Sequence, residues 1–152
     1  FFLKDTEDHI SEAALKASAT KIVDKNTLLC VVRSGILLHT FPVVLTECRM
    51  CHNQDVMSIR TNHKVLNERY LLYFFKAKNR EVLSEGIKPG VTVQSFHSGF
   101  FKNYLIPLPP VKVQSKIIER IEAEHAAVES AGKLMGTYEQ KTRDVISKLW
   151  IE

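Results

Sequence analysis

Short hydrophobic runs alternate with polar turns along the first part of the chain, which is the pattern of strands in a sheet. Four runs predict strands: TLLCVV at 27–32, ILLHTF at 36–41, VVLT at 43–46 and DVMSIR at 55–60. The first has no polar face and lies between Asn26 and Gly35, so we expect it to be buried. The second and third flank Pro42, which favours a position near a sheet edge. The fourth alternates, which predicts one moderately buried face.

Two segments before residue 80 carry the signals of helices. In SEAALKAS, residues 11–18, Ser11 can cap a short helix. In ERYLLYFFKAKN, which follows the capping residue Asn67, an early glutamate and two late lysines suit the helix dipole. Because the aromatic residues of this helix lie at helical spacing among leucines, we assign them to the core and not to an exposed stacking platform.

Residues 85–103, EGIKPGVTVQSFHSGFFKN, differ in character from the runs before them. They contain three glycines, one proline and several small polar side chains. This polarity predicts a loop that stays outside the core. Loops carried on a rigid scaffold are where binding residues usually lie, so this segment is a candidate binding loop.

The segment IPLPP, residues 106–110, stands directly before a long stretch of helix-forming residues. Proline fixes its own φ and biases the preceding residue toward extended backbone, so the segment should be stiff and nonhelical. Pro110 suits the first helical position, where a missing N–H costs nothing. We therefore expect this segment to fix the angle at which the helix leaves the globular body.

From Val113 onward, apolar or small residues recur at spacings of three and four, which is the seam of a heptad repeat. Glu124 and Thr142 interrupt the seam, and Gly132 and Gly136 weaken the helix by about 1 kcal/mol each relative to alanine. A helix of this length cannot bury such a stripe on itself, so it needs a partner helix. The residues predicted to face that partner are Ile117, Ile121, Val128, Met135, Val145 and Leu149.

These patterns predict an α+β fold. We expect a mixed, mostly antiparallel twisted sheet with flanking helices, followed by one long C-terminal coiled-coil helix. Residues 1–106 form the expected globular domain, and residues 107–152 form the proline-rich junction and the long helix.

Charge is distributed unevenly along the chain, whose formal net charge is +4. Residues 13–110 carry thirteen basic and six acidic side chains, whereas residues 111–152 carry seven of each. A basic globular domain joined to a neutral helix is the charge distribution expected of a protein that binds a polyanion. A bias that serves only solubility is the alternative.

The long helix has the length needed to span a DNA site. From Ile117 to Leu149 it rises about 48 Å at 1.5 Å per residue, or roughly 14 base-pair steps of B-DNA. Such a rod can hold two DNA-reading bodies a fixed distance apart. A plain dimerisation coiled coil remains the alternative.

Membrane and export signals are not visible in the sequence. No stretch approaches the roughly 20 uncharged apolar residues that a membrane helix needs, and the first residues lack a basic-then-apolar signal pattern. We expect a soluble cytoplasmic protein with no membrane partner.

The three cysteines, Cys30, Cys48 and Cys51, are an odd number, which argues against a disulfide framework. CRMCH, ending at His52, has the letters of a c-type haem attachment site, but the next residues, NQDVMSIR, are typical of a strand. A structural zinc site needs four ligands, so His39 or His63 would have to complete the set. We expect ordinary buried thiols, no metal and no cofactor.

The junction resembles a known family. IPLPPVKVQSKIIERIE, with its leucine-proline-proline segment followed by Gln114, is similar to the junction of type I restriction-modification DNA specificity subunits. Three further stretches resemble the same family: HISEAALKASATKIVDKNTLL, CHNQDVMSI and NERYLLYFF. The resemblance covers about residues 9–150.

The resemblance implies a function. In this family a target recognition domain reads one half of a split site in double-stranded DNA, spacer helices pair antiparallel, and DNA methyltransferase subunits dock on the assembly. The specificity subunit catalyses nothing, and we find neither a nucleotide-binding glycine loop nor a methyltransferase signature here. The chain holds one recognition domain and one helix where a full subunit has two, and we expect its first strands to be missing. Its partner helix would come from the other half of the subunit or from a homodimer.

Candidate DNA contacts lie on the polar loops. Arg, Asn, Gln, Ser and Thr can read base edges in the major groove, whereas Lys, Arg and loop amides bind phosphates. The residues that we expect to contact DNA are Arg33, Ser34, His52, Asn53, Gln54, Lys88, Thr92, Gln94, Ser95, His97 and Lys102. Asn53 and Gln54 have a structural alternative, in which they bond loop backbone within the domain.

Two other functions remain open from the sequence. The module can also belong to a single-chain restriction-methyltransferase fusion, in which it follows a catalytic domain. A coiled-coil interaction protein without a nucleic-acid role is the alternative from another class.

Overall fold

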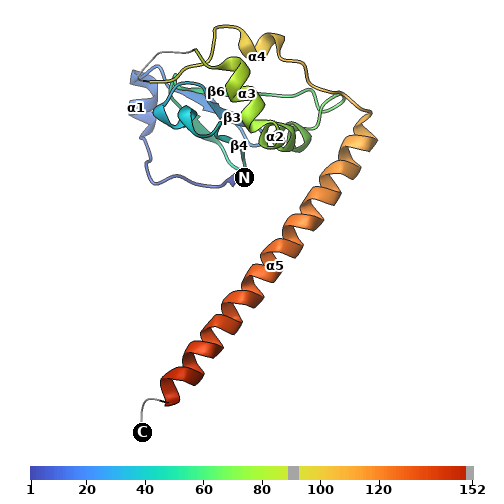
Figure 1. Ribbon diagram of the computed structural model, residues 1–152. Helices are drawn as coiled ribbons and strands as arrows, with labels where there is room; N and C mark the ends of the chain where they lie inside the picture. Colours follow the sequence, from blue (N-terminus) through green and yellow to red (C-terminus); the bar gives the residue numbers. More distant parts are fainter. Residues whose placement is uncertain (89–92, 150–152) are drawn as a thin grey trace. The chain divides into compact units, whose positions relative to one another are not determined.

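The computed structural model describes residues 1–88 and 93–149 and divides the chain into two compact units, Phe1–Ser115 and Lys116–Glu152 (Figure 1). The strands are β1 (Phe2–Leu3), β2 (Lys21–Val23), β3 (Leu28–Val31), β4 (Val43–Thr46), β5 (Met50–His52) and β6 (Val56–Ile59). The helices are α1 (Glu12–Ala17), the 3₁₀ helix η1 (Gly35–Leu38), α2 (Glu68–Ala77), α3 (Asn79–Gly86), α4 (Phe100–Asn103) and α5 (Val111–Leu149).

The first unit contains a four-stranded mixed sheet in the order β1-β4-β3-β6. The β3 strand pairs antiparallel with both β4 and β6, and β1 pairs parallel with β4. A separate antiparallel pair joins β2 to β5. The structure therefore confirms the α+β class, the mixed and mostly antiparallel sheet, and the long C-terminal helix.

Helix α2 packs against the main sheet and forms the core with it. Leu28 and Cys30 of β3 lie opposite Leu45 and Val43 of β4, and all four side chains are buried. The helix contributes five buried side chains: Tyr70, Leu71, Leu72, Tyr73 and Phe75. This confirms that the aromatics of α2 belong largely to the core, although Phe74 is only partly buried.

Both predicted helix caps before residue 80 are confirmed. The Ser11 hydroxyl accepts a hydrogen bond from the Ala14 N–H, and the Asn67 side chain accepts one from the Arg69 N–H. Each cap satisfies a backbone donor that has no partner within its helix. The strands predicted at 27–32, 43–46 and 55–60 are present as β3, β4 and β6.

The strand predicted at 36–41 is wrong, because this segment starts with the 3₁₀ helix η1. The Ser34 hydroxyl accepts from the Ile36 N–H and caps the turn, and only Leu37 of this turn is buried. Farther along, the Asn79 side chain accepts from the Phe41 N–H at 2.9 Å and donates to the Phe41 carbonyl at 2.6 Å. These backbone groups are thus satisfied by a distant side chain and not by a neighbouring strand.

The expected position of residues 43–46 near a sheet edge is also wrong. Strand β4 lies inside the sheet, since the two-residue strand β1 pairs with its outer side. Pro42 lies just before β4, where its carbonyl accepts from the Val31 N–H and its missing donor breaks no pairing within the strand.

The first turn of α5 is tied to the first unit through Gln114, which is completely buried. The Gln114 amide nitrogen donates to the carbonyls of Val65 and Pro109, and its oxygen accepts from the Asn67 N–H. The Pro110 carbonyl accepts from the N–H of Gln114 as well. The glutamine of the junction therefore joins the proline segment, the first turn of α5 and the residue that caps α2.

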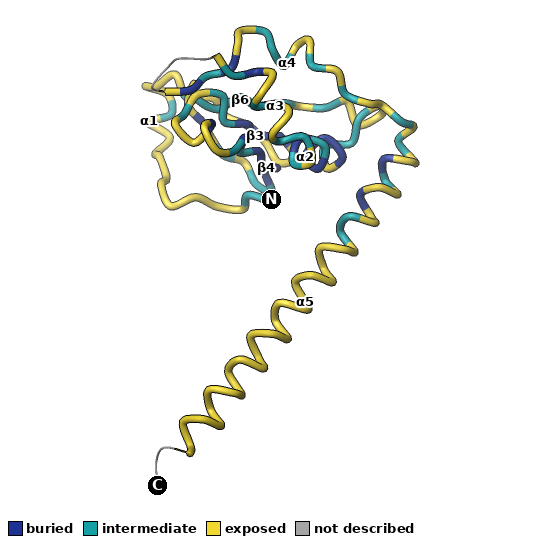
Figure 2. Tube along the Cα trace, viewed as in Figure 1, coloured by how far each residue is buried: buried dark blue, intermediate teal, exposed yellow. Residues whose placement is uncertain are grey.

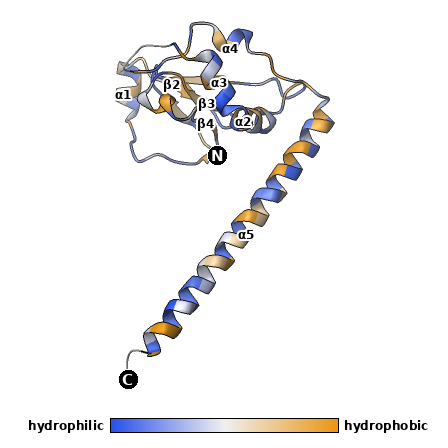
Figure 3. Ribbon diagram, viewed as in Figure 1, coloured by the Kyte–Doolittle hydropathy of each residue, from blue (hydrophilic) through white to orange (hydrophobic). Residues whose placement is uncertain are grey.

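Residues 123–149 of α5 are all exposed (Figure 2). Hydrophobic and hydrophilic residues alternate along this helix (Figure 3). Among the described residues, none of the helices combines the length and the apolar character needed to cross a membrane.

Replacing Gln114 by alanine should destabilise the first unit by at least about 2 kcal/mol, because each buried polar group left unsatisfied costs about 1–3 kcal/mol. Equilibrium urea unfolding followed by near-ultraviolet circular dichroism, which reports the packed aromatic residues, measures this loss. The control is Gln140→Ala on the exposed part of α5, where the side chain makes one surface hydrogen bond to Asp144. An equal loss of stability in the two variants would contradict the role assigned to Gln114.

Candidate nucleic-acid interface

The end of β3 is joined by backbone hydrogen bonds to the segment after residue 93. Arg33 and Ser95 form an isolated antiparallel bridge. The Ser34 N–H donates to the Gln94 carbonyl at 3.0 Å, and the Phe96 N–H donates to the Val32 carbonyl at 3.1 Å. These contacts place residues 94–96 beside residues 32–34, which directly follow β3, although the two segments are about 60 residues apart in the sequence.

Aromatic side chains anchor this polar segment to the core. The Phe96 ring is 8% exposed, and its centroid lies 5.3 Å from that of Phe41 and 4.8 Å from that of Phe101. At Gly86 an added Cβ would lie 2.6 Å from a Phe96 ring carbon and 2.9 Å from a Phe100 ring carbon, so the close approach requires glycine. The prediction that residues 85–103 stay outside the core is therefore wrong for Phe96, and α4 forms within this segment.

An open pocket of about 460 Å³ lies where these segments meet β6 and the start of β2. Its apolar wall includes Val56, Met57 and the three phenylalanines of residues 96–101. Its polar lining residues are Lys21, Arg33, Gln54, Ser58, Ser95, His97, Ser98 and Lys102. We call these eight residues the polar groove. They provide cations for phosphates together with side-chain donors and acceptors for base edges.

The electrostatics of the polar groove favour an anionic ligand. Lys21, Arg33 and Lys102 are exposed, and the described residues that line the pocket include no acidic side chain. Within the described part of the chain, neither Lys21 nor Lys102 forms an ion pair, whereas Arg33 lies 3.9 Å from Asp55. Two of the three cations are thus available to an incoming phosphate.

Five of the predicted DNA-contact residues come together in the polar groove. They are Arg33, Gln54, Ser95, His97 and Lys102. Three residues of the groove were not predicted: Lys21, Ser58 and Ser98. Lys21 and Ser58 each lie within a short strand, and only the pairing of distant segments brings them to the groove. Ser58 could have been predicted from the alternation along β6, because a polar residue between Met57 and Ile59 lies on the less apolar face of the strand.

The other predicted contacts have different surroundings. His52 is buried, and its ring Nδ1 lies 2.8 Å from the Asn53 carbonyl. The Asn53 side chain accepts from the Asp55 N–H, which is the structural alternative given for it above. Gln94 is buried, and the Ser34 hydroxyl caps η1. Lys88 is exposed and does not line the pocket, and Thr92 lies outside the described residues.

The six residues predicted to pair α5 with another helix lie mainly on its exposed surface. Val128, Met135, Val145 and Leu149 are each at least 60% exposed, and Ile117 is 37% exposed. Ile121 is partly buried. Exposed apolar side chains at heptad spacing form a stripe that a second helix can cover.

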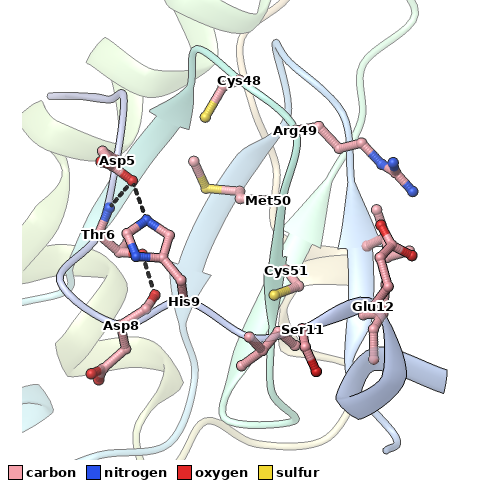
Figure 4. A pocket seen from close by; sticks show the side chains of 13 residues that line it. Asp5, Thr6, Asp8, His9, Ser11, Glu12, Cys48, Arg49, Met50 and Cys51 are labelled. Carbon is pink, nitrogen blue, oxygen red and sulfur yellow. Dashed lines mark hydrogen bonds and ion pairs between the residues drawn. The ribbon is translucent and has the colours of Figure 1, made fainter. Parts of the chain in front are cut away.

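The expectation of buried thiols is confirmed for Cys30 and is wrong for the other two cysteines, since Cys48 is partly buried and Cys51 is exposed. Burial raises the pKa of the Cys30 thiol to about 12, so this thiol stays protonated at neutral pH. Cys48 and Cys51 line a separate pocket of about 260 Å³, in which Met50 lies between them (Figure 4). The Cys48 thiol donates to the Lys4 carbonyl at 3.0 Å. Within residues 1–88 and 93–149, no three His, Cys, Asp or Glu side chains cluster as metal ligands would.

Residues 3–133, which are most of the chain, match the type I restriction modification DNA specificity domain family. The chain belongs to this family. It is also similar to the type I restriction enzyme EcoR124I/EcoR124II specificity subunit of Escherichia coli, with 29% identity over 117 residues. The matched region covers 77% of this chain and 29% of that relative. Membership in the family is consistent with DNA recognition.

Proposed function

We propose that this chain recognises double-stranded DNA as one half of a type I specificity subunit and reads one half of a bipartite site. The observation that carries the proposal is the polar groove, in which four segments of the first unit combine three cations with base-reading side chains. The chain acts as a recognition module, and catalysis is left to other subunits.

Within the polar groove, the side chains divide into two kinds of contact. Lys21 and Lys102 bind phosphates, which sets affinity and orientation without specifying sequence. Gln54 and Ser95 offer both donors and acceptors to base edges. The backbone bridge between Arg33 and Ser95 and the ring packing of Phe96 hold Ser95 on a rigid support. A rigid support lowers the conformational entropy lost on binding.

The long helix supplies the partner contact. The exposed heptad stripe of α5 pairs with a second helix, either from the other half of a subunit or from a second copy of this chain. The family and the E. coli relative support the assignment of this chain to a specificity subunit, since the relative's name describes a specificity subunit of a restriction enzyme. The paired recognition domains then hold DNA methyltransferase subunits on the DNA, in the cytoplasm. Residues 1–106 act as the recognition domain and residues 107–152 as the junction and spacer.

Replacing both Lys21 and Lys102 by alanine should weaken binding to random duplex DNA. It should also make the negative slope of log Kobs against log salt concentration shallower by about 2, since each lost phosphate contact removes about 0.9 from its magnitude. Fluorescence anisotropy across a salt series measures both effects. The control removes two lysines that do not line the groove, with Lys16→Ala and Lys64→Ala. The proposal fails if the wild-type chain shows no salt-dependent binding, or if the control lowers the slope as much.

Replacing Met135 by aspartate should weaken association between copies of the chain by at least about tenfold, or about 1.4 kcal/mol, because a charge would enter the helix seam. Thr137→Asp adds the same charge two residues along, on another face of α5, and should leave association unchanged. Sedimentation equilibrium distinguishes the two variants. A wild-type chain that stays monomeric at high concentration would contradict pairing between copies of this chain. Equal weakening by both variants would contradict pairing through this stripe.

A further inference from the structure

Asp55 is fixed directly beside Arg33 by its backbone. The Asp55 carbonyl accepts from the N–H groups of Val32 and Arg33, at 2.8 Å and 3.3 Å. The Asp55 N–H donates to the Asn53 side chain at 3.0 Å. The carboxylate therefore stands at a set position at the start of β6, on the border of the polar groove.

The carboxylate of Asp55 faces one end of the Arg33 side chain. Its Oδ1 is buried and has no hydrogen-bond partner among the described residues, and it lies 3.9 Å from Arg33 Nη1. The Arg33 side chain is still 62% exposed. A guanidinium has five donors in a planar fork, so one edge can face Asp55 while another remains open to a ligand.

The neighbouring carboxylate makes Arg33 a poor phosphate ligand but a suitable reader of bases. A phosphate brought to Arg33 would meet the negative charge of Asp55 as well, which offsets part of the attraction. Guanine presents two neutral acceptors, O6 and N7, which Arg contacts in a bidentate manner. The carboxylate also restricts the rotamers of the long side chain before DNA arrives, so less entropy is lost on binding. Lys21 and Lys102 have no such carboxylate within the described residues, which fits them for phosphates.

We propose that Arg33 reads a guanine edge in the major groove of the half-site and that Asp55 is the residue that positions it. The inference rests on the proposed DNA-recognition function and adds to it the base that one side chain specifies. It also gives Asn53 an indirect part in recognition, because its side chain fixes the backbone of Asp55.

Selection of bound sequences from a random duplex library tests this proposal, with the wild-type chain and its variants processed in parallel. The wild-type chain should enrich a motif that contains a guanine. Arg33→Ala should lower the preference for that guanine by about tenfold and leave the other positions intact, as expected for the loss of one bidentate contact. Asp55→Asn should relax the same position while raising affinity for random duplex DNA, because it removes a negative charge near the phosphates. If Asp55 only supported the fold, Asp55→Asn would instead lower the affinity for DNA at every position of the motif.

The matched controls come from an ion pair of the same type elsewhere in the first unit. Arg60 and Asp24 lie 3.1 Å apart on exposed surface, and neither lines the groove. Arg60→Ala and Asp24→Asn therefore repeat the two charge changes and should leave the base preferences of the motif unchanged.

The possible results separate this inference from the proposed function. If the wild-type chain enriches no motif, the proposed function itself fails and the inference fails with it. If a motif appears but Arg33→Ala weakens binding to all sequences equally, Arg33 is a phosphate contact and the inference alone is overturned. If Arg33→Ala relaxes a guanine and Asp55→Asn does not, the positioning role of Asp55 is overturned. Near-ultraviolet circular dichroism, which reports the packed aromatic residues, shows in each case that the variant is folded.

Discussion

The packing of Phe96 against Phe41 and Phe101 holds a polar segment on the sheet, and the candidate interface depends on that packing. Without it, Ser95, His97 and Lys102 would belong to a loop with no fixed relation to Arg33. The absence of a side chain at Gly86 permits the contact, since any Cβ there would overlap the Phe96 ring. Backbone hydrogen bonds on both sides of the Arg33–Ser95 bridge then set the register between the segment and the end of β3. The hydrophobic core thus orients side chains that are themselves exposed.

Under the proposed function, the two units of the chain have different physical tasks. The first unit carries the excess positive charge and the polar groove, which suits it for long-range attraction to phosphates and short-range reading of bases. The second unit is nearly neutral, with six basic and seven acidic side chains, and presents an apolar stripe, which suits it for pairing with another helix. Gln114 links the last part of the first unit to the start of the long helix through three buried hydrogen bonds of its side chain. Recognition and assembly can therefore be tested by separate substitutions.

Features set by neighbouring residues could be predicted from the sequence, and features set by distant contacts could not. The caps at Ser11 and Asn67 and the long helix depend on local spacing, and all three were predicted correctly. The segment 36–41 has the composition of a strand, but the Asn79 side chain hydrogen-bonds the backbone N–H and carbonyl of Phe41. Sequence periodicity cannot show such a distant contact. In the same way, Phe96 lies among polar residues, and only its distant aromatic partners show that it belongs to the core.

The site shows the same contrast between local and distant information. Arg33, Gln54 and Lys102 were predicted from their residue types and their place on polar loops, whereas Lys21 could be found only from the pairing of β2 with β5. The most direct measurement is amide hydrogen exchange of the chain with and without duplex DNA at low salt. Binding at the polar groove predicts slower exchange in residues 32–34, 54–58 and 94–102, with little change in residues 60–66. Protection confined to residues 60–66 or to α5, with none in the three groove segments, would contradict the account.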